Sequence, residues 1–417
     1  MKNQTRKDVP LGGIIPQGSL ATALRVVRDP RRPFGWQPQH PPLPLVALLL
    51  LSVVAMLSGA NSHSAIAQWG RERREDQPDL LEALGFPPGQ CPATVTLHRL
   101  FRRLDVVQFE QILGQWLTRT GVTPQEPVAI DGQTLRAVAA SAVPGSHLVS
   151  VYAHASAAVV AQIMVPNKGH EQSALDRLLT QIPLAGRLVT FDALHTHRDV
   201  CQVLDEAGAL FVAPVRANQP TLLAEIQEIF APWPLETGDP PAWLQAEVQQ
   251  AGGAWQSLTR ATLKPCHGRR EWRRICVWTD ARWATSLGWS SDRGQPWPMV
   301  RQLIRVERRR THLRHHCVIK ETQEIVYFLR NQPAPAARTL SEIRRHWQIE
   351  NGLHRQRDVL FDQDRSTVRL GGAAHIFAAL RNLALTILHR HHLPNAAAAR
   401  RTWAGRPHLA VALVLAL

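Results

Sequence analysis

The sequence predicts a mixed α/β fold: a sheet with flanking helices, preceded by a helical domain and interrupted by a β-rich insertion. Three observations lead to this class. Residues 43–120 carry apolar side chains at helical spacing. From residue 127 short β-branched runs appear, and the later ones alternate with helical stretches. Residues 232–335 hold most of the tryptophans and few helical signals.

The first 120 residues divide into a lead-in and a helical domain. Residues 1–42 are polar and rich in Pro and Arg, and we expect a poorly ordered segment there. Residues 45–60 are uncharged and apolar, but fall short of the roughly 20 residues that a membrane-spanning helix needs. We therefore expect a buried core helix and no membrane segment, with a membrane anchor as the alternative.

A second helix is predicted over residues 94–104. The helical domain is expected to continue to residue 120. Its apolar side chains recur at three- and four-residue spacing and form one stripe: Leu97, Leu100, Phe101 and Leu104. Three arginines lie off this stripe, at positions 99, 102 and 103. Their pattern is typical of a DNA-contacting helix and equally of a basic outer face on a core helix.

The α/β domain is predicted to comprise residues 127–231 and 336–392. Strands are expected at 127–131, 147–154, 160–165, 187–192 and 210–215, with helices at 173–182 and 198–207 between the later ones. The insertion, residues 232–335, carries β-like runs at 272–278, 299–306 and 324–329. Helices return near Thr339, where Thr339 and Glu342 have the spacing of a capping box, and again over 372–391. Residues 393–417 form a tail of uncertain structure.

Charge indicates the kind of partner. The formal net charge is +15 and the isoelectric point is near 10.9, which favours a polyanion such as nucleic acid. A surface that is basic for solubility is the alternative. The five cysteines are irregularly spaced without a Cys-x-x-Cys pair, so neither a disulfide framework nor a zinc ribbon is supported. A zinc site from Cys266, Cys276, Cys317 and nearby histidines is a minor alternative. The cysteine usage is typical of a cytosolic protein.

Three carboxylates are the candidate catalytic groups. Asp131 and Asp192 each end an apolar run, and Glu350 lies on a later helix among apolar neighbours. Strand ends are where α/β sheets place functional groups. A carboxylate on an inward helix face needs a cation or hydrogen bonds. The alternatives are a turn signal at Asp131 and a salt bridge from Glu350 to a nearby arginine. Together the three could hold two hard divalent cations.

Five phrases, in chain order, resemble a known family. They are Ala129-Ile-Asp-Gly-Gln-Thr134, Phe191-Asp-Ala-Leu-His-Thr196, Val215-Arg-Ala-Asn-Gln-Pro-Thr221, His267-Gly-Arg-Arg-Glu271 and His346-Trp-Gln-Ile-Glu-Asn-Gly-Leu-His354. The chain resembles bacterial insertion-sequence transposases of the DDE type, in the ISAs branch that includes the H-repeat-associated proteins. The likeness covers roughly residues 43–390. Gln133 departs from it, since a Lys is usual after Asp-Gly.

The resemblance implies an RNase H-like catalytic fold in which Asp131, Asp192 and Glu350 bind two Mg²⁺ ions, with Mn²⁺ as a substitute. It also implies a cytoplasmic, nucleoid-associated bacterial enzyme that binds the terminal inverted repeats of its element, cleaves them and joins them to a target. A homodimer in the synaptic complex follows from the same resemblance. The alternative function is a catalytically inactive DNA-binding remnant.

Further DNA contacts are expected from basic residues of the insertion. Histidines that flank the carboxylates could contact DNA or order a ligand, with packing or solvent exposure as the alternative. A solvated basic face is the ordinary explanation for such arginine runs, but the place of this one in the insertion favours contact with DNA phosphates. The candidates are Arg269, Arg270, Arg273, Arg274, Arg308, Arg309, Arg310, Arg314, His195 and His354.

Overall fold

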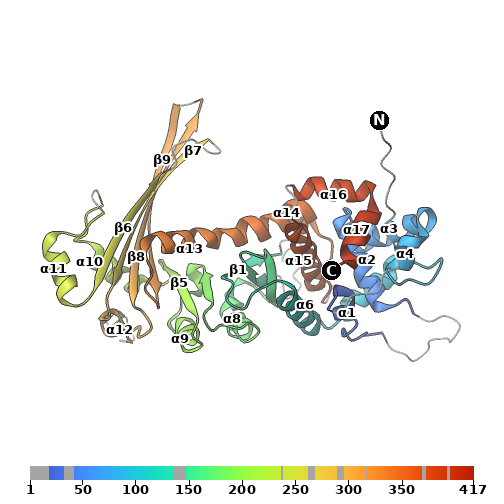
Figure 1. Cartoon of the computed structure of the whole chain (residues 1–417), viewed down its shortest axis with the longest axis horizontal. Helices are drawn as coiled ribbons and strands as arrows, with labels where there is room; N and C mark the ends of the chain where they lie inside the picture. Colours follow the sequence, from blue (N-terminus) through green and yellow to red (C-terminus); the bar gives the residue numbers. More distant parts are fainter. Residues whose placement is uncertain are drawn as a thin grey trace, which may run out of the picture. The chain divides into compact units, whose positions relative to one another are not determined.

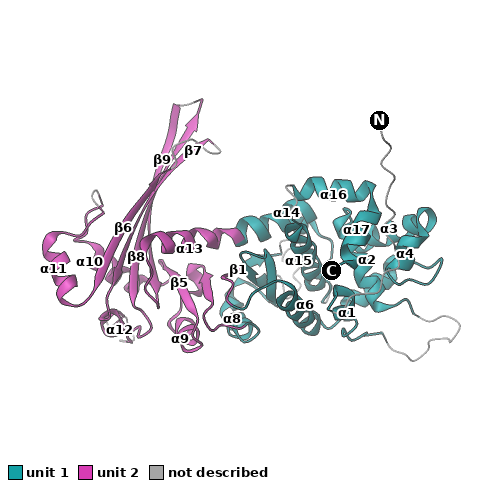
Figure 2. Cartoon of the chain, viewed as in Figure 1, with its two compact units in different colours: residues 1–124, 132–182, 349–417 teal, residues 125–131, 183–348 magenta. Residues whose placement is uncertain are grey.

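The computed structural model describes residues 18–31, 42–135, 147–235, 238–261, 268–288, 295–315, 317–368, 372–391 and 395–417. The chain forms two compact units (Figure 2). Unit 1 comprises residues 1–124, 132–182 and 349–417, and unit 2 comprises residues 125–131 and 183–348. The four divisions fall after Pro124, after Asp131 within β1 (Val128–Thr134), after Ile182, and after Gln348 near the end of α13 (Ala336–Ile349).

The apolar helix expected over residues 45–60 is the core of unit 1. It is α2 (Leu45–Leu57), buried along almost its whole length, and it packs against α3 (His63–Asp76), α15 (Ala373–Arg390) and α17 (Pro407–Leu415). These neighbours take up all sides of the helix, which explains why it carries no polar face. Within the described residues no helix is long and apolar enough to cross a membrane.

The remaining helices of unit 1 confirm the helical start of the chain. They are α1 (Leu20–Leu24), α4 (Pro78–Ala83), α5 (Thr94–Arg103), α6 (Val106–Thr120) and α16 (Ala396–Gly405). The predicted stripe on α5 is buried, and Arg99, Arg102 and Arg103 are exposed. Two elements were not anticipated: α1 within the lead-in, and the pair α16–α17 within the tail. The helix α1 has only five residues, and α17 is apolar on nearly all sides, so neither shows an amphipathic period; Leu20 and Val411 are nevertheless fully buried.

Unit 1 also contains the hairpin of β2 (His147–Ala153) and β3 (Ala158–Val165), whose strands pair antiparallel. The helices α6, α15 and α8 (Glu171–Leu179) pack on β3. A short 3-10 turn, η1 (Lys168–His170), precedes α8. Near the C-terminus η3 (Glu350–His354), a π-helical turn, leads into α14 (Arg355–Phe361) and the 3-10 turn η4 (Gln363–Arg365).

In unit 2 the start of β1 pairs parallel with β4 (Leu188–Phe191), and β4 pairs parallel with β5 (Leu210–Val215). The 3-10 turn η2 (Ala193–His195) and α9 (Arg198–Glu206) connect β4 to β5. The helix α10 (Pro220–Phe230) follows β5, and α11 (Ala242–Gln250) and α12 (Trp283–Ser286) lie within the insertion. The predicted mixed sheet is confirmed: among the described residues it has nine strands in the order β3-β2-β1-β4-β5-β9-β8-β7-β6.

The insertion extends this sheet. Its strands are β6 (Ala254–Ala261), β7 (Arg269–Thr279), β8 (Gln302–Arg314) and β9 (Cys317–Arg330), all paired antiparallel, and β9 also pairs with β5. Figure 1 shows β7, β8 and β9 running as one long, twisted ribbon. The first of the four strands, β6, was missed because its side chains are half-buried or exposed and lack β-branched alternation.

The capping box predicted at Thr339 and Glu342 is wrong. The helix begins at Ala336, so Thr339 lies inside its first turn and is fully buried. The Glu342 side chain does not cap the start of the helix. Its carboxylate forms ion pairs with the buried Arg330 at the end of β9 and with Arg338, at 2.9 Å. The acidic side chain therefore ties α13 to the sheet.

Candidate active site

The two predicted aspartates lie beside each other at the carboxyl ends of paired strands. In the parallel register Ile130 is opposite Phe191, and the next residues are Asp131 and Asp192. Asp131 is half-buried, and the side chain of Asp192 is 39% exposed. The carboxylate of Asp192 accepts a hydrogen bond from the His195 backbone N–H at 3.3 Å, which caps the short turn η2. Local folding thus fixes both aspartates at one edge of the sheet.

The loop that follows Asp192 is supported by the segment after β5. Asn218 donates to the Ala193 carbonyl at 2.6 Å, and Gln219 donates to the Thr196 carbonyl at 3.0 Å. The phrase from Val215 to Thr221 thus has a structural role beside Asp192. A pocket of about 200 Å³ adjoins this aspartate, with apolar walls and with Arg216, His346 and Trp347 among its lining residues.

Glu350 opens the π-helical turn η3 and is exposed, whereas His354, at its end, is 4% exposed. Among the residues that the structure describes, no ion pair joins Glu350 to an arginine. The salt-bridge alternative for this carboxylate therefore has no support. π-Helical turns widen a helix locally and are frequent at functional sites. Here the turn presents a carboxylate and an imidazole four residues apart.

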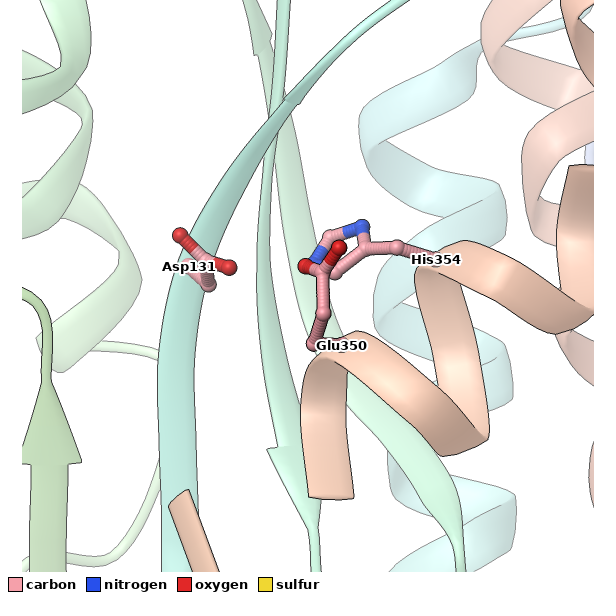
Figure 3. A group of neighbouring side chains, drawn as sticks. All are labelled: Asp131, Glu350 and His354. Carbon is pink, nitrogen blue, oxygen red and sulfur yellow. The ribbon is translucent and has the colours of Figure 1, made fainter. Parts of the chain in front are cut away.

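Asp131, Glu350 and His354 form a group of potential metal ligands (Figure 3). One ligand atom from each lies within 4.8 Å of the others. Figure 3 shows the Glu350 carboxylate and the His354 ring approaching each other from η3, with Asp131 on the neighbouring strand. Asp192 does not belong to this close group as its side chain stands. Carboxylate oxygens suit Mg²⁺ and Mn²⁺, and an imidazole nitrogen suits a transition metal, so these residues fit a divalent cation.

Within unit 1, a polar network centred on Gln133 and Arg357 contacts His354. The Gln133 Oε1 accepts from His354 Nδ1 at 3.0 Å, from Arg357 Nη1 at 3.1 Å and from Gln363 Nε2 at 3.2 Å. Its Nε2 donates to an Asp358 carboxylate oxygen at 3.2 Å. Arg357 is fully buried, and burial lowers the pKa of its guanidinium to about 9. These contacts hold the His354 ring in place.

Gly132, between Asp131 and Gln133, faces a second buried pair. The His147 Nε2 lies 2.5 Å from a Glu171 carboxylate oxygen, and His147 Nδ1 lies 2.9 Å from the Thr134 hydroxyl. A Cβ at position 132 would overlap His147 and would lie 2.7 Å from Glu171. Glycine is therefore required here for space rather than for backbone conformation.

The arginines predicted to bind DNA gather on the β7–β9 ribbon, and several pair with acidic residues. Glu271 accepts from Arg269 at 3.0 Å and also from Arg273. Glu324 accepts from Arg308 at 2.8 Å. Arg309 lies 2.7 Å from Glu307, and its guanidinium lies 4.8 Å from the Trp272 ring centre. Part of the basic run therefore stabilises the ribbon itself.

Arg270, Arg274 and Arg314 complete the predicted set, together with Arg310. Arg270 and Arg314 are exposed, and Arg274 stacks its guanidinium 4.9 Å from the Trp272 ring centre. Arg310 lies 3.9 Å from Glu271 and 3.9 Å from Glu324. The exposed members are available to an external anion, and the stacked and paired ones are held in fixed positions.

Sequence patterning missed a basic pocket of about 580 Å³ in unit 2. It lies between β6, β7 and α13, and four arginines line it: Arg260, Arg273, Arg344 and Arg345. Glu271 is its acidic lining residue. Arg273 has its pKa lowered, mainly by burial, with Arg344 and Arg310 acting in the same direction and Glu271 opposing it. The pocket thus concentrates positive charge that a phosphate group would neutralise.

The two histidines considered for DNA contact, His195 and His354, are buried, as in the packing alternative. The side chain of His195 is 0% exposed and that of His354 is buried. Neither ring is open to a DNA phosphate in this structure. The spacing of Glu350 and His354 was a readable signal for a different role, since residues four apart share one face of a helix. The zinc alternative falls partly outside the described residues, because Cys266 and its neighbouring His267 are not among them.

Comparison with known families agrees with this geometry. Residues 123–387 match the model described as "Transposase DDE domain", and residues 21–117 match one described as "DDE_Tnp_1-associated". The first match covers more than half of the chain and confirms the RNase H-like fold that the resemblance implied. The second covers most of the helical start of the chain.

Similar curated proteins include several from Escherichia coli. The chain is 25% identical over 375 residues to the "H repeat-associated putative transposase YhhI" of Escherichia coli K12, which covers 88% of this chain and 90% of the relative. It is equally similar to the "Putative protein YbfL" of the same strain. It is 26% identical over 344 residues to the "Putative transposase YncI" of Escherichia coli O157:H7, covering 82% of this chain and 81% of the relative.

Proposed function

Because this chain belongs to the DDE transposase family, we propose that it binds the ends of its own insertion sequence and catalyses metal-dependent strand cleavage and transfer. The observation that carries the proposal is the convergence of carboxylates on one edge of the sheet. Asp131 and Asp192 follow paired strand positions, and Glu350 brings its carboxylate to within 4.8 Å of an Asp131 oxygen.

Asp131, Asp192 and Glu350 would hold two Mg²⁺ ions, for which Mn²⁺ would substitute. When bound, such a pair supplies positive charge beside both the attacking and the leaving oxygen of a phosphodiester. The chain's own groups then position the DNA. Asp131 and Asp192 follow adjacent paired strands of one unit, so these two carboxylates would keep their spacing while the nucleophile, water or a 3′-hydroxyl, approaches in line with the leaving oxygen.

The basic pocket and the exposed arginines of the ribbon support the binding half of the proposal. Phosphate contacts from arginine are sequence-independent and position a duplex rather than read it. Unit 2, which carries Asp131 and Asp192, also carries these basic groups: the exposed Arg270 and Arg314, and the pocket that includes Arg260 and Arg344. Two element ends must meet for transfer, so we further propose that the cytoplasmic enzyme works on the bacterial nucleoid as a homodimer.

The test is cleavage of a labelled duplex that carries the element's inverted repeats, in Mg²⁺, in Mn²⁺ and with EDTA. Substitutions Asp131→Ala, Asp192→Ala and Glu350→Ala should each lower the cleavage rate more than about 100-fold, since each removes a ligand from a two-metal site. A matched control is Glu82→Ala, an exposed carboxylate on α4 that should leave the rate unchanged.

Two results would contradict the proposal. Undiminished cleavage by Asp192→Ala would remove this aspartate from the site. Tight binding of the repeats without cleavage in any metal would favour the alternative function, a DNA-binding remnant that has lost its chemistry. Mass measurement of the complex with two labelled ends tests the dimer, which predicts two protein chains per pair of ends.

A further inference from the structure

The contacts of Gln133 determine which nitrogen of His354 carries the proton. Two neighbouring groups, Arg357 and Asp358, determine which atom of the Gln133 side-chain amide is the oxygen and which is the nitrogen. Arg357 only donates hydrogen bonds, so the atom facing its Nη1 at 3.1 Å must be the amide oxygen. An Asp358 carboxylate oxygen lies 3.2 Å from the other amide atom, which must therefore be the nitrogen.

With the amide so oriented, His354 Nδ1 faces an oxygen at 3.0 Å that has no proton to give. The proton of this hydrogen bond therefore belongs to Nδ1, and the neutral ring carries its lone pair on Nε2. Figure 3 shows the His354 ring extending toward the Glu350 carboxylate and the side of Asp131. The tautomer thus offers a nitrogen ligand within the same group as the two carboxylates.

Arg357 makes this arrangement rigid. Besides Gln133, its guanidinium donates to Asn382 Oδ1 at 2.8 Å, to Gln162 Oε1 at 3.2 Å and to the Ser150 hydroxyl at 3.3 Å. Asn382 in turn donates to Gln162 at 2.7 Å. All five groups belong to unit 1. A ligand histidine whose second nitrogen is held by a fixed partner is the ordinary design of a metal centre.

We propose that His354 Nε2 is a nitrogen ligand of a divalent cation held by Asp131 and Glu350, and that Gln133 is the positioning residue that fixes its tautomer. This inference deepens the proposed function and rests on it. It adds a consequence for metal preference. An imidazole ligand strengthens binding of transition metals such as Mn²⁺ relative to Mg²⁺, for which oxygen ligands suffice. The site should therefore bind Mn²⁺ more tightly than Mg²⁺.

The test uses Mn²⁺ bound to the full chain and needs no cleavage. Pulsed electron paramagnetic resonance detects a directly bound histidine as coupling of the Mn²⁺ electron spin to nitrogen-14. Wild type should show this coupling, and His354→Asn should lose it while still binding Mn²⁺ through Asp131 and Glu350. The control His408→Asn removes an exposed histidine of α17 and should keep the coupling.

A second variant, Gln133→Leu, separates positioning from ligation. It keeps His354 and removes the oxygen that fixes its proton on Nδ1. The Mn²⁺ dissociation constant should rise roughly 10–100-fold, as is usual when the partner of a ligand histidine is lost. The Mg²⁺ dissociation constant should rise less. Equal losses for both metals, or no change for Mn²⁺, would refute the role of Gln133.

The outcomes distinguish the two proposals. Mn²⁺ bound by wild type and lost in Glu350→Ala, but without nitrogen coupling, would leave the carboxylate site standing and overturn the ligand role of His354. The same role is overturned if His354→Asn keeps the coupling. Wild type that binds no Mn²⁺ at millimolar concentration would contradict the proposed function and this inference together.

Discussion

Arg357→Met is expected to destabilise unit 1 strongly. The substitution keeps much of the side-chain volume and removes a fully buried guanidinium with four hydrogen-bond partners. It would leave the Gln133, Gln162 and Asn382 amide oxygens short of a donor. Each buried group left unsatisfied costs about 1–3 kcal/mol, so these three groups should cost about 3–5 kcal/mol in total near the lower end of that range.

The loss should appear as a lower melting temperature. For a unit of this size 1 kcal/mol corresponds to roughly 2–4 °C, so the transition of unit 1 should fall by roughly 6–20 °C. The matched control is Arg355→Met, an exposed arginine on the same helix, which should change stability by less than about 0.5 kcal/mol. If Arg357→Met lowered the melting temperature as little as Arg355→Met does, the hydrogen-bond network of Arg357 would not stabilise unit 1, and the reasoning would be refuted.

Three further predictions concern stability. Burial, with His98 nearby, lowers the pKa of His63 from 6.5 to about 4. Between pH 6.5 and pH 4 this histidine is therefore protonated in the unfolded chain and neutral in the folded chain. About 3 kcal/mol of stability should be lost as the pH falls from 6.5 to 4, and His63→Leu should flatten that slope in a melting series; an unchanged slope would contradict it. Gly132→Ala should cost about 1–3 kcal/mol through overlap with the buried pair behind it, whereas Gly405→Ala, with open space around it, should melt like wild type. Glu342→Gln should cost about 3–5 kcal/mol because Arg330 stays buried without its anionic partner, and chemical denaturation that shows less than about 1 kcal/mol would argue against this.

Local patterning was sufficient for most of the sheet and for the core helices. The strands β1 to β5 are buried on both faces or nearly so, and their β-branched runs stand out against the flanking polar segments. The three carboxylates were proposed from their conjunction and from the family resemblance, because strand ends and an apolar helix stripe are places where functional groups lie, and their role stays a prediction. The helix at 372–391 was also confirmed, as α15.

The features that patterning missed depend on contacts between distant residues. His354 and Gln133 are separated by 221 positions, and no local signal links them. The predicted capping box is wrong because Thr339 and Glu342, although correctly spaced, lie inside a helix that begins at Ala336. Glu342 instead forms an ion pair with Arg330 at the end of β9. The arginine run was identified as basic from composition alone, but its ion pairs follow from strand register, which brings Glu271 opposite Arg310.

The Arg357 network also has a consequence for the order of events during synthesis. All three carboxylates have left the ribosome once residue 350 has emerged, but Asn382 and the rest of α15 follow later. Until then the guanidinium of Arg357 lacks one of its partners and the position of His354 is not fixed. A nascent or prematurely terminated chain would therefore carry every acidic ligand without a rigid centre.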